Sequence, residues 1–135
     1  MNTFDRTSTL DLTVYGYHCD VYQHVNNGRY LEFLEAARWH HYRTIFETKQ
    51  LEAKGWAMLI VELNIKYKRA ARLSDTLSII TSLESISHVR VNLKQHIIDK
   101  HNKKTIAIAK VQFALVDLVA NRPLRLSEEI KNWLA

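Results

Sequence analysis

Alternation of apolar and polar residues predicts five strands along this chain. In residues 57–68, apolar side chains occupy every second position, with charged and amide side chains between them. That pattern is typical of a strand with one buried face. Residues 8–16 alternate in the same way, and residues 76–83, 89–98 and 105–118 are further strand segments rich in apolar side chains. The chain should therefore be built mainly on a sheet.

A helical spacing follows the first strand. The apolar stripe consists of Tyr30, Leu31, Leu34, Ala37, His41 and Ile45. This spacing predicts an amphipathic helix over about residues 27–47. Asn26 and Asn27 are favoured N-cap residues, and Gly28 would let a ligand approach the backbone at the first turn. The start of the helix should present unpaired N–H groups that can hold an anion or polarise a carbonyl.

The segments between these elements are short and polar. Residues 84–88 should close a hairpin, residues 48–55 should form a connector, and residues 121–123 should end the last strand. Ser127 then caps a short C-terminal helix. Short connections make successive strands antiparallel, and the long helix must bury its stripe against the sheet. The prediction is one α+β domain over residues 1–135, with a long helix wrapped by a mainly antiparallel sheet of about five strands.

Composition is that of a globular protein. The chain has 135 residues, of which 47% are hydrophobic and 24% charged, and this excludes wholesale disorder. No apolar run approaches the roughly 20 residues of a membrane helix, and residues 1–6 lack the features of a signal peptide. Cys19 is the one cysteine, so no internal disulfide can form. We expect a cytoplasmic protein without membrane insertion.

The net charge of +5 is unevenly distributed. Residues 62–72 carry four basic side chains against one acid, and residues 90–104 carry five against one. Basic segments of this kind suit a phosphate-bearing ligand, a nucleic acid or an anionic membrane, although a solvated surface has the same composition. No recognised nucleic-acid motif accompanies the charge, so we expect no nucleic-acid partner.

Residues 17–30 contain an acid, a thiol, two imidazoles and several side-chain amides, which are side-chain types used in catalysis and ligand binding. Asp20 lies just before the predicted helix, where a carboxylate could act as base or nucleophile while helix N–H groups stabilise an oxyanion. It could also only brace its own loop. Cys19 should point away from Asp20, because neighbouring side chains of an extended segment lie on opposite faces, and we expect a packed, inert thiol. His24 could orient Asp20 or bond its own loop.

A family resemblance rests on this stretch. The motif Tyr-x-x-Asp-x-x-x-His-Val-Asn-Asn-x-x-Tyr-Leu occupies residues 17–31. With the element order above, it resembles the hotdog-fold thioesterases of the 4-hydroxybenzoyl-CoA thioesterase-like group, and within that group the bacterial long-chain acyl-CoA thioesterases. The likeness continues through residues 64–75. It implies hydrolysis of acyl-CoA, no metal, no cofactor other than the coenzyme A of the substrate, and a homodimer or homotetramer with sites at the subunit interface.

The resemblance also implies roles for individual residues. Asp20 matches the catalytic aspartate, and the backbone N–H of Asn27 matches the donor that polarises the thioester carbonyl. We include His24 as a third catalytic candidate. Substrate contacts are expected near the helix start, and the CoA phosphates are expected on basic side chains. The candidates are Tyr17, Asn26, Gly28 and Tyr30 for the first group and Lys66, Lys68, Arg69 and Arg72 for the second.

Other functions share parts of the pattern. An acyl-carrier-protein thioesterase or a non-catalytic acyl-CoA-binding domain would have the same fold. Hydratases of 3-hydroxyacyl thioesters resemble this chain less, because their histidine follows the aspartate by five residues, whereas His24 follows Asp20 by four. Glu35 could supply a helix carboxylate, although Arg38 three residues later offers it a salt-bridge partner. The seven histidines show no metal-ligand spacing.

Overall fold

The computed structural model describes residues 6–45 and 48–134. Its elements are a single sheet, one long helix and several short helices. In chain order they are β1 (Thr7–Thr13), η1 (Gly16–His18), α1 (Arg29–Tyr42), α2 (Thr48–Ala53), β2 (Trp56–Tyr67), β3 (Thr76–Ile86), β4 (Val91–Asp99), β5 (Thr105–Asp117), β6 (Arg122–Pro123) and α3 (Glu128–Leu134).

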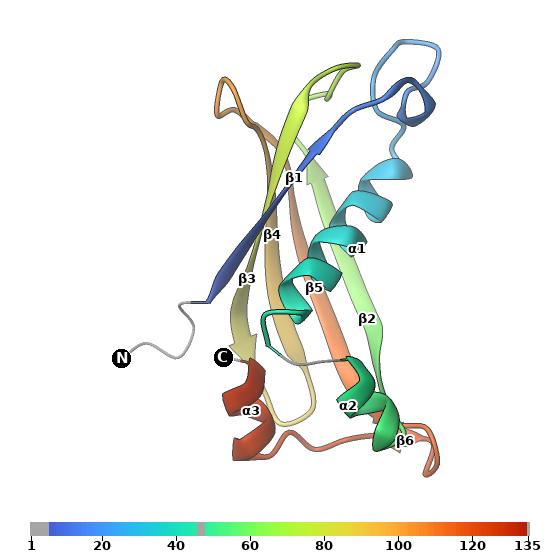
Figure 1. The fold of residues 1–135 in the computed structure, drawn as a ribbon, viewed down its shortest axis with the longest axis vertical. Coiled ribbons are helices and arrows are strands. Elements are labelled where there is room, and N and C mark those ends of the chain that lie inside the picture. Colours follow the sequence, from blue (N-terminus) through green and yellow to red (C-terminus); the bar gives the residue numbers. More distant parts are fainter. Residues whose placement is uncertain (1–5, 46–47, 135) are drawn as a thin grey trace.

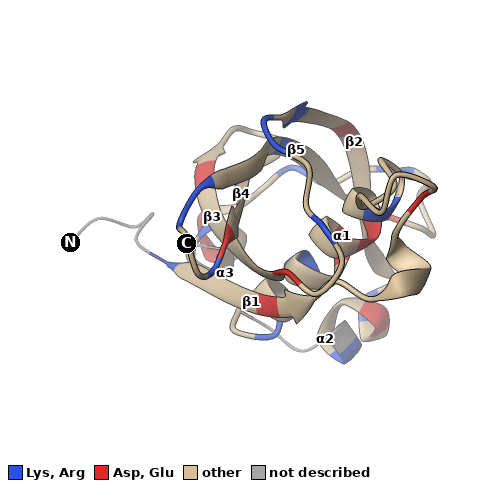
Figure 2. Ribbon diagram, turned by 90° about the horizontal axis from the view of Figure 1, so that it is seen from above, with Lys and Arg blue, Asp and Glu red and all other residues tan. Residues whose placement is uncertain are grey.

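The sheet is antiparallel throughout, with the strand order β1-β3-β4-β5-β2 and with β6 paired to the end of β5. Helix α1 crosses one face of this sheet (Figure 1) and packs against β1 and β3. Seen along the long axis of the molecule (Figure 2), the sheet curls around α1. The predicted α+β arrangement of one long helix wrapped by an antiparallel sheet is confirmed.

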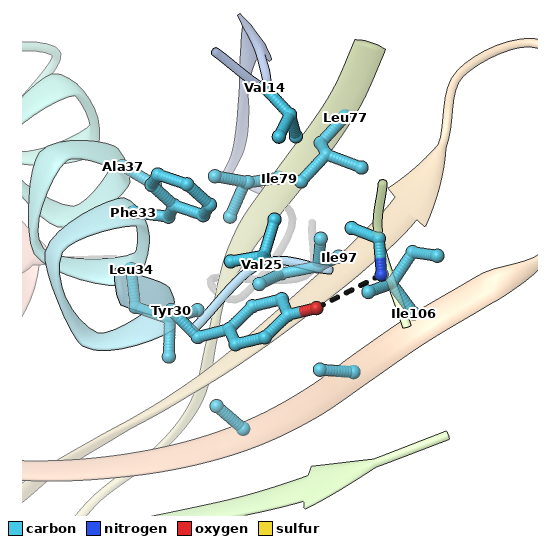
Figure 3. Packing of buried hydrophobic residues seen from close by; sticks show 13 residues of the cluster. Val14, Val25, Tyr30, Phe33, Leu34, Ala37, Leu77, Ile79, Ile97 and Ile106 are labelled. Atoms are coloured by element: carbon cyan, nitrogen blue, oxygen red, sulfur yellow. Dashed lines mark hydrogen bonds between the residues drawn. The ribbon is translucent and has the colours of Figure 1, made fainter. Parts of the chain in front are cut away.

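The core between α1 and the sheet consists of two hydrophobic clusters. The first lies along the N-terminal half of α1 and includes Tyr30, Phe33 and Leu34 (Figure 3). The second begins with Tyr42 and includes Phe113 together with residues of α3. Fully buried side chains of this kind each contribute roughly 1.5–3 kcal/mol, so the two clusters hold α1 firmly in place.

The helices differ from the sequence prediction in three places. Helix α1 begins at Arg29 rather than at residue 27, and it ends at Tyr42, with turns following it up to residue 45. Residues 46–47, where the prediction ended the helix, lie outside the described ranges. The predicted connector over residues 48–55 contains helix α2. Such short helices carry too little apolar periodicity to be recognised from sequence.

Strand β2 corrects a prediction about burial. We expected one buried face, but Leu59, Ile60 and Val61 are exposed by 51%, 46% and 47%. Two causes act together. β2 is an edge strand that pairs with β5 alone, and a β-bulge between Ile60 and Glu62 shifts its alternation by one residue. Within residues 6–45 and 48–134, no element thus covers the outer edge of this apolar strand.

Two boundaries in the second half of the chain also differ. The predicted hairpin turn over residues 84–88 lies later, because β3 continues to Ile86 and the turn is closed by a hydrogen bond from the Ser87 N–H to the Arg90 carbonyl at 2.9 Å. Residues 121–123 do not merely end the last strand. Arg122 and Pro123 return along β5 as the short strand β6.

Candidate active site

The loop before α1 is fixed by a buried histidine. The His18 ring lies edge-on to Phe33 with centroids 5.0 Å apart, and its Nδ1 accepts the Tyr15 N–H at 2.9 Å. Its carbonyl accepts the Asn26 N–H, also at 2.9 Å. Burial lowers the pKa of His18, because the charged ring would lose its hydration. His18 is therefore a neutral anchor that ties the loop to α1.

Asp20 both braces its loop and keeps one carboxylate oxygen available. Its Oδ1 accepts the N–H of Tyr22 at 2.9 Å and the N–H of His24 at 3.4 Å, while its own N–H donates to the His24 carbonyl at 2.9 Å. Across the described ranges, no hydrogen bond reaches its Oδ2. The residue is exposed. The structure thus shows the bracing role that the sequence left open, and it leaves room for chemistry at the second oxygen.

The start of α1 has a polar turn ahead of it. The Asn26 side chain accepts the Gly28 N–H at 2.9 Å, and its carbonyl accepts the Arg29 N–H at 2.9 Å. Asn26 thus closes a turn ahead of the helix, whose N-cap is Gly28 without a side-chain cap, so neither Asn26 nor Asn27 is the N-cap that the sequence predicted. The Asn27 N–H has no acceptor within the described part of the chain. A donor at this position, at the positive end of the helix dipole, can bind a carbonyl or an oxyanion.

The opposite wall comes from β2 and the segment that follows it. The Tyr30 hydroxyl accepts the Ala71 N–H at 3.1 Å (Figure 3), and Val25 donates its N–H to the Ala71 carbonyl at 2.9 Å. The Tyr67 hydroxyl donates to the Asn27 carbonyl at 3.3 Å, with its ring 5.3 Å from that of Tyr30. These bonds hold the two chain segments against each other.

Between these walls lies a cavity of about 310 Å³ that brings most of the predicted site together. It places the carboxylate-bearing Asp20 in one space with Asn27. It is lined by Asp20, His24, Val25, Asn27, Tyr30, Tyr67, Lys68, Arg69 and Ala70. Tyr67 was missed as a site residue, although it lies within the run of residues 64–75 that carries the family resemblance. Its place in that run was the signal that could have identified it.

Other predicted residues lie outside this cavity. Tyr17 is 68% exposed on η1, with Arg29 over its ring at 5.9 Å. Asn26 and Gly28 shape the helix start without lining the space, and Gly28 has an ordinary φ of −69°. Lys66 lies exposed on β2, and Arg72 lies at a neighbouring cavity. A Cβ added at Gly28 would meet its nearest contact within the chain, the Asn26 side chain, at 3.4 Å, so neither the backbone conformation nor the packing of the chain requires glycine there.

Two further expectations are resolved by the structure. The Cys19 thiol donates to the Tyr15 carbonyl at 3.7 Å and packs against the core rather than lining the cavity, in agreement with an inert thiol. The salt bridge expected between Glu35 and Arg38 is wrong, because Arg38 is buried and donates to Gln95 instead. Among the described residues, no group of three or more His, Cys, Asp or Glu could hold a metal ion.

Comparisons with known proteins agree with this geometry. Residues 15–134 match the family model described as "Thioesterase-like superfamily". The chain is 39% identical over 123 residues to the long-chain acyl-CoA thioesterase FadM of Escherichia coli, covering 91% of this chain and 93% of that protein. It is 30% identical over 129 residues to the acyl-CoA thioesterase YbgC of Haemophilus influenzae, covering 94% and 93%.

A solved structure supports the fold as well. The probable thioesterase YbaW from Escherichia coli superposes with a TM-score of 0.86 and 36% sequence identity, covering 94% of this chain and 98% of that one. Together with the curled antiparallel sheet, this confirms the predicted hotdog fold. None of the helices in the described ranges has the length and apolar content needed to cross a bilayer.

Proposed function

This chain belongs to the thioesterase-like superfamily, and we propose that it hydrolyses long-chain fatty acyl-CoA to free fatty acid and CoA. The observation that carries the proposal is the juxtaposition of the Asp20 carboxylate and the unpaired Asn27 N–H in one cavity. Thioester hydrolysis needs these two groups, a base or nucleophile and a donor for the developing oxyanion. The relatives named as acyl-CoA thioesterases support the substrate class.

The Asn27 N–H is the proposed oxyanion donor. As the carbonyl carbon becomes tetrahedral, negative charge develops on its oxygen, and a donor fixed at a helix start stabilises that charge without reorganising. One such donor is typically worth about 2.7–4 kcal/mol of barrier. The bond from the Tyr67 hydroxyl to the Asn27 carbonyl holds the peptide next to this donor in position.

The Asp20 carboxylate is the proposed base or nucleophile, acting through Oδ2 while Oδ1 keeps the loop in place. As base, it takes a proton from water, whose oxygen attacks the carbonyl carbon. As nucleophile, it attacks that carbon itself, and water then hydrolyses the resulting anhydride. In both cases the C–S bond breaks and the CoA sulfur receives a proton. His24 lines the same space and is proposed to position the water. The reaction uses no metal or separate cofactor.

The test is thiol release from a series of acyl-CoAs of increasing chain length, with wild type beside Asp20→Asn. Turnover that is highest on long chains and lost in the variant supports the enzyme, the residue and the substrate class together. Turnover only on acyl thioesters of acyl carrier protein would show that these, and not acyl-CoA, are the substrates. Binding of acyl-CoA without any turnover would indicate a non-catalytic binding domain.

We further propose that the active form is a homodimer or homotetramer with sites at the subunit interface. The support is β2, an edge strand whose Leu59, Ile60 and Val61 are about half exposed and whose last residue, Tyr67, lines the cavity. An uncovered apolar edge strand favours pairing with another strand. Light scattering should give a multiple of the 15.8 kDa chain mass, and Val61→Lys should lower it. A monomeric, fully active wild type would contradict this.

The location is proposed to be cytoplasmic, supported by the single free thiol of Cys19.

A further inference from the structure

The end of the molecule that carries the candidate active site is formed by three loops that are bonded to one another (Figure 1). They lie before α1, between β2 and β3, and between β4 and β5, and they are residues 14–28, 68–75 and 100–104. The Ser74 N–H donates to the Val14 carbonyl at 2.9 Å, and the Lys100 N–H donates to the Thr76 carbonyl at 2.9 Å. The three loops therefore form one surface, which we call the loop face.

Large apolar side chains are exposed on the loop face. They are Tyr15, Tyr17, Val21, Tyr22 and Leu73. Val21 and Tyr22 occupy the two central positions of a tight turn and are 90% and 75% exposed. The turn is closed by the Gln23 N–H, which donates to the Asp20 carbonyl at 3.0 Å. A well-bonded turn thus holds two large apolar side chains in water, and such exposure is typical of a surface that binds a partner.

The loop face is also basic. Its three loops carry six Lys and Arg side chains against two carboxylates, those of Asp20 and Asp75. In the described ranges, no carboxylate lies within ion-pair distance of Lys103 or Lys104. Lys104 lines one cavity together with Arg72, so cations from two of the loops lie close together. Such a face repels a second copy of itself and attracts a surface of anionic groups.

Exposed tyrosines, aliphatic side chains and free cations together match the surface of an anionic bilayer. Tyrosine rings favour the level of the lipid headgroups, aliphatic side chains favour the boundary beneath it, and lysines are attracted to anionic lipids. A single-stranded nucleic acid would use the cations and the aromatic rings. Its bases would not stack on Val21, which is the most exposed large hydrophobic side chain in the described ranges. The aliphatic turn therefore favours lipid.

We propose that the loop face binds peripherally to anionic phospholipid bilayers, with Val21 and Tyr22 at the headgroup level and Lys103 and Lys104 on the lipid phosphates. Binding of this kind needs no membrane-spanning helix. The candidate active-site cavity lies at this face, because Asp20 lines it. A long-chain fatty acid released there would partition directly into the bilayer. That consequence rests on the proposed function, whereas the binding of lipid does not.

The test is flotation of the protein with vesicles of mixed phosphatidylglycerol and phosphatidylcholine, beside vesicles of phosphatidylcholine alone. Wild type should bind the anionic vesicles and should be released as the salt concentration rises, because salt screens the attraction. The double variant Val21→Ser/Tyr22→Ser should weaken binding by about tenfold or more, since the apolar contact is lost. Lys103→Gln/Lys104→Gln should weaken it about 25-fold, at about fivefold for each cation near an anionic surface.

The opposite end of the molecule supplies matched controls (Figure 1). On the turn after β5, Leu118 and Val119 are 60% and 89% exposed. Like the turn before α1, this turn follows an aspartate whose Oδ1 accepts the N–H of the residue two positions later. Leu118→Ser/Val119→Ser and Arg122→Gln/Arg125→Gln therefore remove comparable groups from exposed positions at the far end. Both should leave vesicle binding unchanged, and thermal unfolding should confirm that all four double variants are folded.

Each outcome decides the proposal. Binding to anionic vesicles that both loop-face variants weaken and both controls retain would support it. Equal weakening in the controls, or no binding of wild type to anionic vesicles at low salt, would overturn it.

Two other partners of the loop face would be detected with the same variants. A lower solution mass of Val21→Ser/Tyr22→Ser by light scattering would make this face an interface between copies of the chain. A stronger effect of the variants on binding of a single-stranded RNA oligonucleotide than on vesicle binding would make it a nucleic-acid surface. Either result would overturn the lipid proposal. Absence of turnover on every thioester, with vesicle binding as expected, would overturn the proposed activity alone.

Discussion

Two groups of polar residues lie beside α1, one before its start and one halfway along it, and their hydrogen bonds differ in kind. At the N-terminal end, Asp20, His24 and Asn27 line an open cavity and are held mainly by backbone hydrogen bonds. Halfway along the helix, Arg38 and Gln95 are buried, and their hydrogen bonds run between side chains. The first group precedes α1, whereas the second joins Arg38 of α1 to Gln95 of β4, and only the first group faces solvent.

The buried group is satisfied within the protein. Gln95 is fully buried. Its Oε1 accepts from Arg38 at 3.1 Å, and its Nε2 donates to the Leu34 carbonyl and the Thr81 hydroxyl, both at 3.0 Å. The polar layer of Arg38, Gln95 and Thr81 separates the two hydrophobic clusters. Buried polar groups that are paired in this way stabilise one packing arrangement, and each becomes costly when its partner is removed.

The exposed group is incompletely satisfied, and its unpaired atoms are the ones that the proposed chemistry needs. The Oδ2 of Asp20 and the N–H of Asn27 have no partner in the described part of the chain. The polar residues beside α1 thus differ in their unmet hydrogen bonds rather than in residue type. Those with unmet bonds at the solvent are the ones proposed for chemistry, and those with satisfied bonds in the core stabilise the fold.

The largest effect should come from Asp20. Asp20→Asn keeps an Oδ1 acceptor for the Tyr22 and His24 N–H groups, so unfolding should be unchanged, while kcat should fall by about 10²–10⁴-fold. Asp20→Ala should lose the same activity and also about 1 kcal/mol of stability, because the loop bonds disappear. Thermal unfolding measured beside a thioesterase assay separates the loss of activity from the loss of stability. Equal stability of both variants would show that the brace is unimportant.

Gln95→Leu should give the largest change in stability. It removes the amide acceptor of the buried Arg38 guanidinium, and a buried donor left without its acceptor typically costs about 1–3 kcal/mol. Urea unfolding measures this loss. Adding Arg38→Met to the same chain should recover part of it, because both polar partners are then apolar. A double variant less stable than Gln95→Leu would contradict the pairing.

His41 should make stability depend on pH. It is 1% exposed, its Nδ1 lies 2.7 Å from the Ser8 hydroxyl, and its Nε2 has no partner in the described part of the chain. Burial first, and then nearby cations, lower the pKa of His41 to about 4 from 6.5.

Because the folded pKa lies below the unfolded one, the unfolded state binds more protons as the pH falls. Full stability should therefore be present above pH 6.5, and about 3 kcal/mol should be lost as the pH falls from 6.5 through 4. Unfolding free energies across that range measure the slope. His41→Leu should flatten it, and a variant that keeps the wild-type slope would assign the loss to other groups.

The smallest effect should come from Gly28→Ala. The backbone there is already helical, and the added Cβ would lie at ordinary contact distance from Asn26. The change should stabilise the protein by about 0.4–1 kcal/mol and leave activity within about twofold. A loss of activity above tenfold at unchanged stability would show that the substrate does need a glycine at the helix start.

The loop that carries the candidate active site could be located from sequence because its determinants are local. Asp20, His24 and Asn27 lie within eight positions of one another, and the helix that follows has a clear apolar stripe. A carboxylate next to a helix start is a relation between neighbours in sequence. The sequence therefore identified most of the first cavity, including Lys68 and Arg69 from the basic segment after β2.

Features that depend on distant partners could not be predicted. Arg38 was assigned to Glu35, but its acceptor is Gln95, 57 residues away on β4. The exposure of β2 follows from its place at the sheet edge and from a bulge, which alternation alone does not reveal. Lys104 joins Arg72 only because the β4–β5 turn and the segment after β2 meet at one end.

The most direct test of the division between the two groups measures both properties on both variants. The unfolding free energy and the kcat/KM per folded molecule on a long-chain acyl-CoA are determined for Asp20→Asn and Gln95→Leu. We predict that Asp20→Asn loses activity at wild-type stability and that Gln95→Leu loses stability at wild-type activity. If Asp20→Asn kept most of its activity, or if Gln95→Leu lost activity while folded, the account would be contradicted.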